Sequence, residues 1–485
     1  MEKGTSTANP HQFVLSKDAR PGYSARFELG GWLLHHGEAH AQTKILDRAG
    51  NLIGCFLGSV VDFASNSFRP DAITVAWEAG SDFELLEQAL YERAGSWIAI
   101  IVTPHLSAVY LDACGSMPLV YFEGQPLAGA SASALLDRSR YFDDLYEEAK
   151  SDRWFKSDWY HTAGLTAHRS LKRLLPNHRL DLQSWTVRRI WPLQPLVDRG
   201  IEQAADEISQ AARATIEIAM SGRKALMPLT AGNETRALLS LTRGFQQDLT
   251  FFTGSFPGAI VDLGTARRLS KRLELRHVIS KVRAKTDEEI RDWRFQTGHC
   301  VGGAVGQNKL DRRNIADAQV EFSGAAGEVG RGYLWSSGDT HTSKLSSAVL
   351  LARLKLPPIE RFKEAVSSWL GSVEQFDAFT IMDLAYIELK MACWAGPQAP
   401  GSDTLTVQIW PLSSRRCFAA MMSAPLDVRR DQSLFMRMVQ RQWPELLLTP
   451  INRGTAWENL NSFMYRASSP RRIWAKIRKS LAEAG

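Results

Sequence analysis

The sequence predicts an α/β protein whose two parts differ in the spacing of their apolar residues. Up to about residue 195, short apolar runs alternate with turn residues, as in "GSWIAIIVTPHLSAVYLDACGSMPLVYF", and this pattern is typical of strands and hairpins. Beyond that point, segments with helical periodicity alternate with short apolar strands. A chain of 485 residues is also too long for one ordinary core. We therefore predict two domains, 1–195 and 196–485.

The first part contains one clear helix among its strands. We expect this helix over 82–94, "DFELLEQALYERA". The segment 178–192, "HRLDLQSWTVRRIWP", reads as a hairpin that closes the domain. Trp191 to Gly200 carries two prolines and a glycine. Because these residues interrupt regular structure, we place the linker there.

The second part predicts a parallel sheet covered by helices on both faces. Apolar residues at helical spacing predict a helix over 201–220. Strands and helices then alternate, which implies parallel strands. The expected strands are 223–230, 248–254, 275–282 and 318–324, and the expected helices between them are 234–245 and 261–274. From about residue 355 the pattern is mostly helical, with 367–394 as the longest candidate helix.

Composition favours a cytoplasmic protein. Hydrophobic residues make up 44% of the chain and charged residues 23%, as in soluble globular proteins. No apolar run reaches the roughly 18 residues of a membrane helix, and the first residues lack the apolar core of a secretory signal. The five cysteines are scattered and form no CxxC pair. We expect buried, reduced thiols rather than disulfides or a zinc site.

The net charge of +6 is concentrated at the C-terminal end. Six basic residues lie between 466 and 479, namely Arg466, Arg471, Arg472, Lys476, Arg478 and Lys479. Such a segment could bind nucleic acid or an anionic membrane. No recognition motif accompanies it, so a solvated basic helix is favoured and we expect no nucleic-acid partner.

The turn after the first strand of the second part concentrates groups that bind anions and metals. It reads "LTAGNETR", residues 229–236. In an open parallel sheet, ligands bind at the carboxyl ends of strands, and the start of a helix attracts phosphate. The carboxylate of Glu234 would repel a phosphate unless Mg²⁺ lay between them. The alternative is a plain strand–turn–helix connection with Glu234 in the first helical turn.

Three segments in order resemble the asparagine synthetase family. "LTAGNETR" is similar to the SGGxDS pyrophosphate loop of N-type ATP pyrophosphatases. "FFTGSFPGAIVDLGTARRLSKRLELRHVIS" follows as it does in that family, and "FSGAAGEVGRGYLW" resembles its downstream loop. The hairpins of the first part resemble the class II glutamine amidotransferase domain that precedes the synthetase domain. The resemblance covers residues 25 to 460 approximately.

This resemblance implies an architecture and a site. The first domain would be an Ntn-hydrolase-like αββα sandwich, and the second a doubly wound parallel-sheet ATP pyrophosphatase domain with additional helices. Glu234 and Glu328 would hold Mg²⁺. ATP and pyrophosphate would contact a larger set: Leu229, Thr230, Ala231, Gly232, Asn233, Glu234, Thr235, Arg236, Thr253, Gly254, Ser255 and Gly324.

Two departures from the family pattern affect the activity that the resemblance implies. A class II amidotransferase needs a cysteine directly after the initiator methionine, and this chain has Glu2 there. Glutamine hydrolysis is therefore not expected, as in the related β-lactam synthetases and lasso-peptide cyclases. In the downstream loop, Ala325 stands where the family often has an acidic residue, which leaves the general base unassigned.

Three residues are candidates for the cation that would stabilise the adenylate-forming transition state. The family uses a late lysine, for which this chain has no clear match. Arg453 lies in a suitable late loop, while Arg331 and Lys344 flank "GEVGRGY". For each of them a surface or structural role is the alternative.

The resemblance implies an ATP-dependent ligase that forms AMP. It would adenylate a carboxylate of a small molecule or peptide, release pyrophosphate, and couple the acyl group to an amine. The competing interpretation is an inactive or regulatory homologue that binds a nucleotide or a partner. The substrates remain open, and so does the oligomeric state, for which a homodimer is one option.

Overall fold

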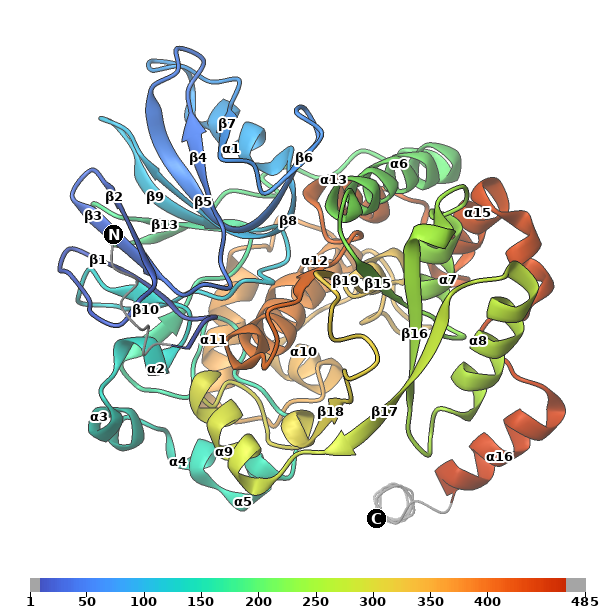
Figure 1. The fold of residues 1–485 in the computed structure, drawn as a ribbon. Coiled ribbons are helices and arrows are strands. Elements are labelled where there is room, and N and C mark those ends of the chain that lie inside the picture. The colour runs from blue at the N-terminus through green and yellow to red at the C-terminus, as the bar shows by residue number, and fades with distance from the viewer. Residues whose placement is uncertain (1–8, 468–485) are drawn as a thin grey trace.

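The computed structural model describes residues 9–467 and confirms the α/β class (Figure 1). The basic C-terminal segment predicted above lies outside the described residues, except for the backbone of Arg466. Three sheets organise this part of the chain. Over residues 9–467 the structure contains no helix with the length and apolar character needed to cross a bilayer. All five cysteines are buried and free, as expected.

The first part of the chain forms two antiparallel-rich sheets. One has the order β12 (Leu171–Arg173), β10 (Val120–Phe122), β11 (Ala128–Gly129), β1 (Phe13–Ser16), β3 (Trp32–His36), β2 (Ala25–Leu29). The other has the order β14 (Val187–Arg189), β13 (His178–Asp181), β9 (Ser107–Leu111), β8 (Ala94–Val102), β5 (Leu52–Asp62), β4 (Gln42–Leu46), β7 (Ala72–Thr74), and β6 (Ser67–Phe68) pairs with β5. Only the β4–β7 pair in these two sheets is parallel.

These two sheets pack on each other through alternating side chains. Phe13 and Leu34 of the first sheet share one buried cluster with Leu57, Ile98 and Val109 of the second. Alternation directs every second residue of a strand to the same face, so each sheet contributes one apolar face to this layer. Helix α1 (Phe83–Tyr91) forms within the predicted segment 82–94. Short helices α2 (Ala132–Leu135), α3 (Arg138–Asp143), α4 (Glu147–Lys150) and α5 (Asp152–Phe155) follow.

The second part of the chain is built on a mostly parallel sheet. Its order is β18 (Asn308–Leu310), β17 (His277–Ala284), β16 (Leu249–Ser255), β15 (Ala225–Pro228), β19 (Val320–Phe322), β20 (Val407–Ile409). Only the edge strand β18 runs antiparallel to its neighbour. The chain moves outward from β15 to β16 and β17, and then returns to the other side of β15 for β19 and β20. This reversal at β15 is where ligands bind in open α/β sheets.

Helices connect and cover this sheet. Helix α7 (Asn233–Ser240) joins β15 to β16, and α8 (Ile260–Leu273) joins β16 to β17, as the alternating pattern predicts. Figure 1 shows α8 beside β16 and β17, with the yellow and orange helices on the other side of the sheet. Further helices of this part are α6 (Gly200–Met220), α9 (Asp287–Gln296), α10 (Ser347–Arg353), α13 (Arg415–Met422), α14 (Leu426–Arg430), α15 (Ser433–Gln442) and α16 (Ala456–Ala467).

The prediction of one long helix over 367–394 is wrong. Helix α11 (Glu360–Gly371) ends early, and a new helix α12 (Ala378–Leu384) begins after Asp377. The carboxylate of Asp377 accepts a hydrogen bond from the Phe379 amide at 2.9 Å and so caps this new start. The chain continues from α12 into a π-helix, η4 (Ala385–Ala395).

The two parts of the chain share buried contacts. The side chain of Glu388 in η4 is fully buried. It accepts hydrogen bonds from Arg189 Nη1 and Nη2 at 2.7 Å each, from Asn177 Nδ2 at 3.0 Å and from Trp369 Nε1 at 2.7 Å. The largest apolar cluster likewise includes residues of both parts, such as Trp97 and Ile208. The domain boundary at 195/196 stays a prediction.

Candidate functional site

The turn after β15 is closed by its own hydroxyl groups. The amide of Gly232 donates to Thr230 Oγ1 at 3.1 Å, and Thr230 Oγ1 lies 2.6 Å from Thr235 Oγ1. Gly232 is the N-cap of α7 and supplies no side chain to cap the helix. Within the described residues, the backbone amides of Asn233, Glu234 and Thr235 donate no hydrogen bond. Three free donors at a helix start form an anion-binding position.

Two neighbouring segments fix the backbone of this turn. The amide of Ala231 donates to Asp262 Oδ1 at 2.9 Å, and the carbonyl of Ala231 accepts from the Asn452 amide at 2.7 Å. Asp262 lies in the first turn of α8, a place where acidic residues are common, and its position in the chain did not indicate this anchoring role. Both contacts leave the amides at the start of α7 free.

Two of the predicted ATP contacts, Arg236 and Thr253, are buried and bonded to the backbone of neighbouring segments. Arg236 is fully buried, and its Nη1 donates to the carbonyl oxygens of Leu446 and Thr449 at 2.9 and 2.8 Å. Thr253 is also buried, and its hydroxyl donates to the Leu229 carbonyl at 2.7 Å. The described contacts of Arg236 and Thr253 therefore hold the sheet and its covering segments together.

The other predicted ATP contacts lie close to the turn. Gly254 and Ser255 form the end of β16 and are partly exposed. The side-chain amide of Asn233 is mostly buried and donates to Gln432 Oε1. Strand β16 pairs with β15 in parallel. The ends of both strands therefore reach the same edge of the sheet.

The loop after β19 packs directly on Glu234. A Cβ atom on Gly324 would lie 3.0 Å from Glu234 Cβ, and one on Gly327 would lie 2.8 Å from Glu234 Cγ. Only glycine fits this second contact without a shift of the neighbouring side chain. Between these glycines, Ala326 adopts a left-handed conformation with φ of 70°. Because β19 is the parallel neighbour of β15, both loops emerge at the same sheet edge.

Arg331 joins the two predicted metal-binding carboxylates. Its Nε lies 2.6 Å from Glu234 Oε1, and its Nη2 lies 4.0 Å from Glu328 Oε1. Burial alone would lower the pKa of Arg331, but the carboxylates of Glu234 and Glu328 raise it above its usual value. The structure thus brings together Glu234, Glu328 and Arg331, which come from segments about 100 residues apart in the chain.

Glu328 has an oxygen atom available for a ligand. Its Oε2 is buried and has no hydrogen-bond partner among the described residues. Burial and the nearby charge of Glu234 raise the pKa of this carboxyl group. A buried, unpartnered carboxylate oxygen beside a second carboxylate suits a hard cation such as Mg²⁺, so the residues present fit the predicted metal. Residues 9–467 contain no group of three or more potential metal ligands, and further ligands would have to be phosphate oxygens or water.

Tyr386 and Lys390 also lie at the candidate site, although no sequence pattern indicated them. Burial and the charge of Glu328 raise the pKa of Tyr386 well above its usual range. The ring of Tyr386 packs against that of Tyr333, with centroids 5.1 Å apart. Lys390 Nζ lies 5.6 Å from the centroid of the Tyr333 ring. Both missed residues lie on the π-helix η4, a structure that often marks functional sites and has no recognisable sequence signature here.

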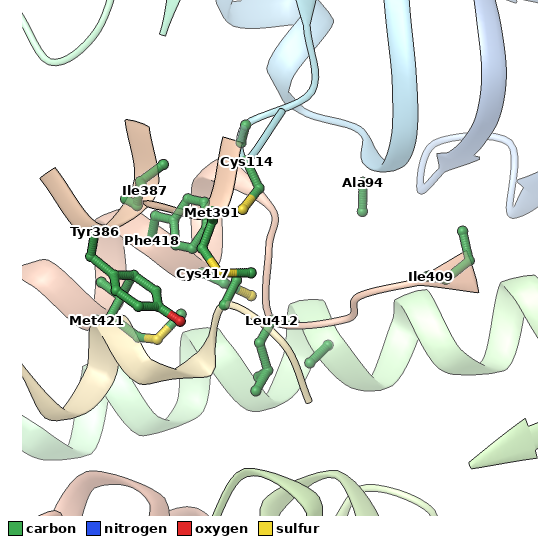
Figure 2. Packing of buried hydrophobic residues seen from close by; sticks show 14 of the residues in the cluster. Ala94, Cys114, Tyr386, Ile387, Met391, Ile409, Leu412, Cys417, Phe418 and Met421 are labelled. Carbon is green, nitrogen blue, oxygen red and sulfur yellow. The ribbon is translucent and has the colours of Figure 1, made fainter. Parts of the chain in front are cut away.

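A segment of the first part of the chain also reaches this site. Cys114 follows β9 and is buried against residues of the second part, including Met391 and Phe418 (Figure 2). Burial raises the pKa of its thiol well above the usual range, and the charges of Asp112 and Glu328 act in the same direction. A reactive cysteine needs the opposite shift. Cys114 therefore packs beside the site as an apolar group.

The three candidate cations differ in their placement. Arg331 is inside the site, as described above. Arg453 is exposed and directly follows Asn452, whose amide contacts the turn at Ala231. Lys344 is exposed and makes no hydrogen bond or ion pair with any described residue.

Comparisons with known proteins add no assignment. No protein-family model matches the chain. A search of curated proteins finds no match either.

Proposed function

We propose that the protein is an ATP-dependent, AMP-forming synthetase that activates a substrate carboxylate and couples it to an amine. It would be of the asparagine synthetase-like type, with an Ntn-type first domain that does not hydrolyse glutamine and a doubly wound ATP pyrophosphatase domain. The observation that carries the proposal is the meeting of Glu234, Glu328 and Arg331 beside the free amides that begin α7. Glu234, Glu328 and Arg331 lie in two of the segments that resemble the asparagine synthetase family.

Each group has a role in this reaction. The amides of Asn233, Glu234 and Thr235 bind the pyrophosphate as it leaves, because their dipoles are already oriented toward the anion. The substrate carboxylate attacks the α-phosphorus, and an amine then attacks the acyl carbon while AMP departs. Arg331 keeps the carboxylate pair from repelling the nucleotide. These contributions are mostly positioning and charge stabilisation.

A magnesium ion would be held by the carboxylates of Glu234 and Glu328. When bound, it would neutralise phosphate charge and orient the triphosphate. The glycines at 324 and 327 let the second loop approach closely enough for both carboxylates to face the same region.

One observation favours the alternative of a non-catalytic nucleotide-binding homologue. Arg331 already forms a close ion pair with Glu234. If this pair persisted when ATP was bound, the site would keep a positive charge without recruiting a metal through Glu234. Binding would then survive and catalysis would be lost.

The two functions are separated by product analysis and nucleotide binding. We would incubate the protein with ATP, Mg²⁺, a panel of carboxylic acids and an amine, and measure AMP, ADP and pyrophosphate. AMP with pyrophosphate supports the synthetase, and ADP formation contradicts it. If no product forms with any acid, we would measure the affinity for the non-hydrolysable α,β-methylene ATP by calorimetry in the presence of Mg²⁺. Equal affinity of wild type and Glu234→Gln would support the non-catalytic homologue.

A further inference from the structure

A cavity of about 500 Å³ opens beside the candidate site, between the two parts of the chain. Its wall includes Ser323 and Ala325, which belong to the loop that packs on Glu234. On the other side it is lined by Ser59 and Ser96 from β5 and β8. The cavity is therefore in contact with the candidate reaction site at one end and with the first part of the chain at the other.

The lining of this cavity is rich in aromatic side chains. Trp293 of α9, Trp394 of η4 and Trp410 after β20 all contribute to it, together with Met391 and Leu405. Aromatic and thioether groups bind planar or apolar ligand bodies with large contact areas. A volume of this size accommodates a small organic molecule.

The charges of the lining are unbalanced. Lys309 is neutralised, because its Nζ lies 2.8 Å from Asp403 Oδ2 and 2.7 Å from Glu289 Oε1. Arg69 instead donates only to neutral acceptors, Ser59 Oγ at 3.0 and 2.8 Å and the Ala39 carbonyl at 3.3 Å. No described carboxylate forms an ion pair with Arg69.

Lys285 is the second cation without a carboxylate partner. Its Nζ lies 5.1 Å from the ring centroid of Trp293, and no described residue forms an ion pair with it. The two histidines of the lining add no charge at neutral pH, because burial lowers the pKa of His40 to about 3 and also lowers that of His11. The cavity therefore combines aromatic walls with two cations, Arg69 and Lys285, that form no ion pair with a described carboxylate. Asp403, which also lines the cavity, is paired with Lys309 and acts on Lys285 only from a greater distance.

We propose that this cavity binds the body of the acid substrate, and that this substrate has an aromatic or planar apolar body and a second anionic group besides the carboxylate that is activated. The inference rests on the proposed function for the identity of the ligand as a substrate. The anion site itself rests on the cavity alone. A substrate with one carboxylate would leave the charges of Arg69 and Lys285 unpaired in a half-buried cavity, which is unfavourable.

The anion site can be tested without catalysis. The reporter is 1-anilinonaphthalene-8-sulfonate, an aromatic anion, with N-phenyl-1-naphthylamine as its neutral counterpart. We expect Lys285→Gln and Arg69→Gln to weaken sulfonate binding about tenfold, because each removes one charged partner, and to leave binding of the neutral probe unchanged. Lys281→Gln is the matched control, since Lys281 lies on β17, the strand that directly precedes Lys285, is exposed and does not line the cavity.

Displacement of the reporter tests the second anionic group. Benzylsuccinate and 3-phenylpropionate share the phenyl body, and the former has one more carboxylate. We expect benzylsuccinate to displace the sulfonate probe at a concentration about tenfold lower, and this preference to disappear in Lys285→Gln. Lys285 makes no described side-chain hydrogen bond, so this variant is expected to remain folded, which thermal unfolding checks.

The outcomes separate this inference from the proposed function. If wild type and both variants bind the sulfonate probe equally, or if both acids displace it equally, the anion site is overturned and AMP formation is untouched. If the probes discriminate but no acid supports AMP formation, the anion site stands and the proposed reaction falls. AMP formation with benzylsuccinate but not with 3-phenylpropionate would support both.

Discussion

Arg331 Nε donates a hydrogen bond to Glu234 Oε1 at 2.6 Å and thereby connects the first turn of α7, which follows β15, with the segment that follows β19. These strands are parallel neighbours, so the two residues meet although 97 positions separate them in the chain. A carboxylate that is paired with a guanidinium and lies in the first turn of a helix with free amides is suited to organise a nucleotide phosphate with its metal. The contact makes Glu234 the first residue to change.

We predict that Glu234→Gln lowers AMP formation about 100-fold or more, because it removes the charge that holds the metal while keeping the side-chain volume. Product chromatography with ATP and Mg²⁺ measures this. Glu234→Asp should retain much more activity, since aspartate offers the same oxygen ligands and is the residue of the family pattern. Equal loss in both variants would point to a packing defect, which Glu217→Gln, an exposed change on α6, would not share.

The second prediction concerns the pH dependence of stability at Glu328. Burial and the charge of Glu234 raise its pKa in the folded protein, so the folded state binds a proton more tightly than the unfolded state does. The contribution of Glu328 to stability is therefore greatest below its unfolded pKa and is lost as the pH rises through the folded pKa. Glu328→Gln should remove this loss. Urea unfolding across pH 4–8 should show a smaller decline in the variant than in wild type.

The opposite pH dependence of stability would contradict this prediction. If Glu328 were held as a carboxylate by Arg331 alone, wild-type stability would rise over the same pH range and Glu328→Gln would flatten that rise instead. Asp144→Asn serves as the control, because this carboxylate accepts hydrogen bonds from Ser170 away from the site.

The third prediction concerns the support of the second loop. Arg429 Nη2 donates to Asp383 Oδ2 and to the Val329 carbonyl, each at 2.6 Å, and both charged side chains are almost fully buried. Arg429→Met would leave Asp383 buried without its partner, at a cost of about 3–5 kcal/mol in the free energy of unfolding. Adding Asp383→Asn should recover much of that loss, because no unpaired charge remains. Chemical denaturation of Arg429→Met and of the double variant measures both free energies of unfolding. A double variant that is less stable than Arg429→Met would contradict this prediction.

The local pattern of the sequence predicted the elements that carry the turn. Glycine and small residues after a short apolar run indicated that a helix starts near Glu234, and α7 begins at Asn233. The alternation of strands and helices also predicted the parallel pairing of β15 with β16. These features depend on neighbouring residues, which is why a single sequence reveals them.

The missed parts of the site depend on contacts between distant segments. Tyr386 and Lys390 lie in a run of apolar and small residues that looks the same for any buried helix, and only the folded chain places them near Glu328. The place of Arg236 in the turn predicts a phosphate contact, and this contact stays a prediction. Arg236 Nη1 donates to the carbonyl oxygens of Leu446 and Thr449, which nothing in the local sequence indicates.

The fourth prediction distinguishes the exposed candidate cations. Arg453 follows Asn452, whose amide donates to the carbonyl of Ala231, so the backbone of Arg453 lies beside the turn that precedes α7. Lys344 is exposed, and among the described residues its side chain has no hydrogen bond or ion pair that would hold it there. We expect Arg453→Ala to lower AMP formation about tenfold, because a cation paired with phosphate oxygens is lost, and Lys344→Ala to change it by less than about twofold.

Salt dependence provides the mechanistic check on this prediction. Because Arg453 is exposed, its interaction with the nucleotide is screened by ions. The difference between wild type and Arg453→Ala should therefore shrink when the ionic strength rises from about 0.05 to 0.5 M, and Arg453→Lys should restore part of the activity at low salt. A large loss in Lys344→Ala together with an unchanged Arg453→Ala would assign the cation to the segment after Tyr333 and would show that the loop at 450–454 only supports the turn.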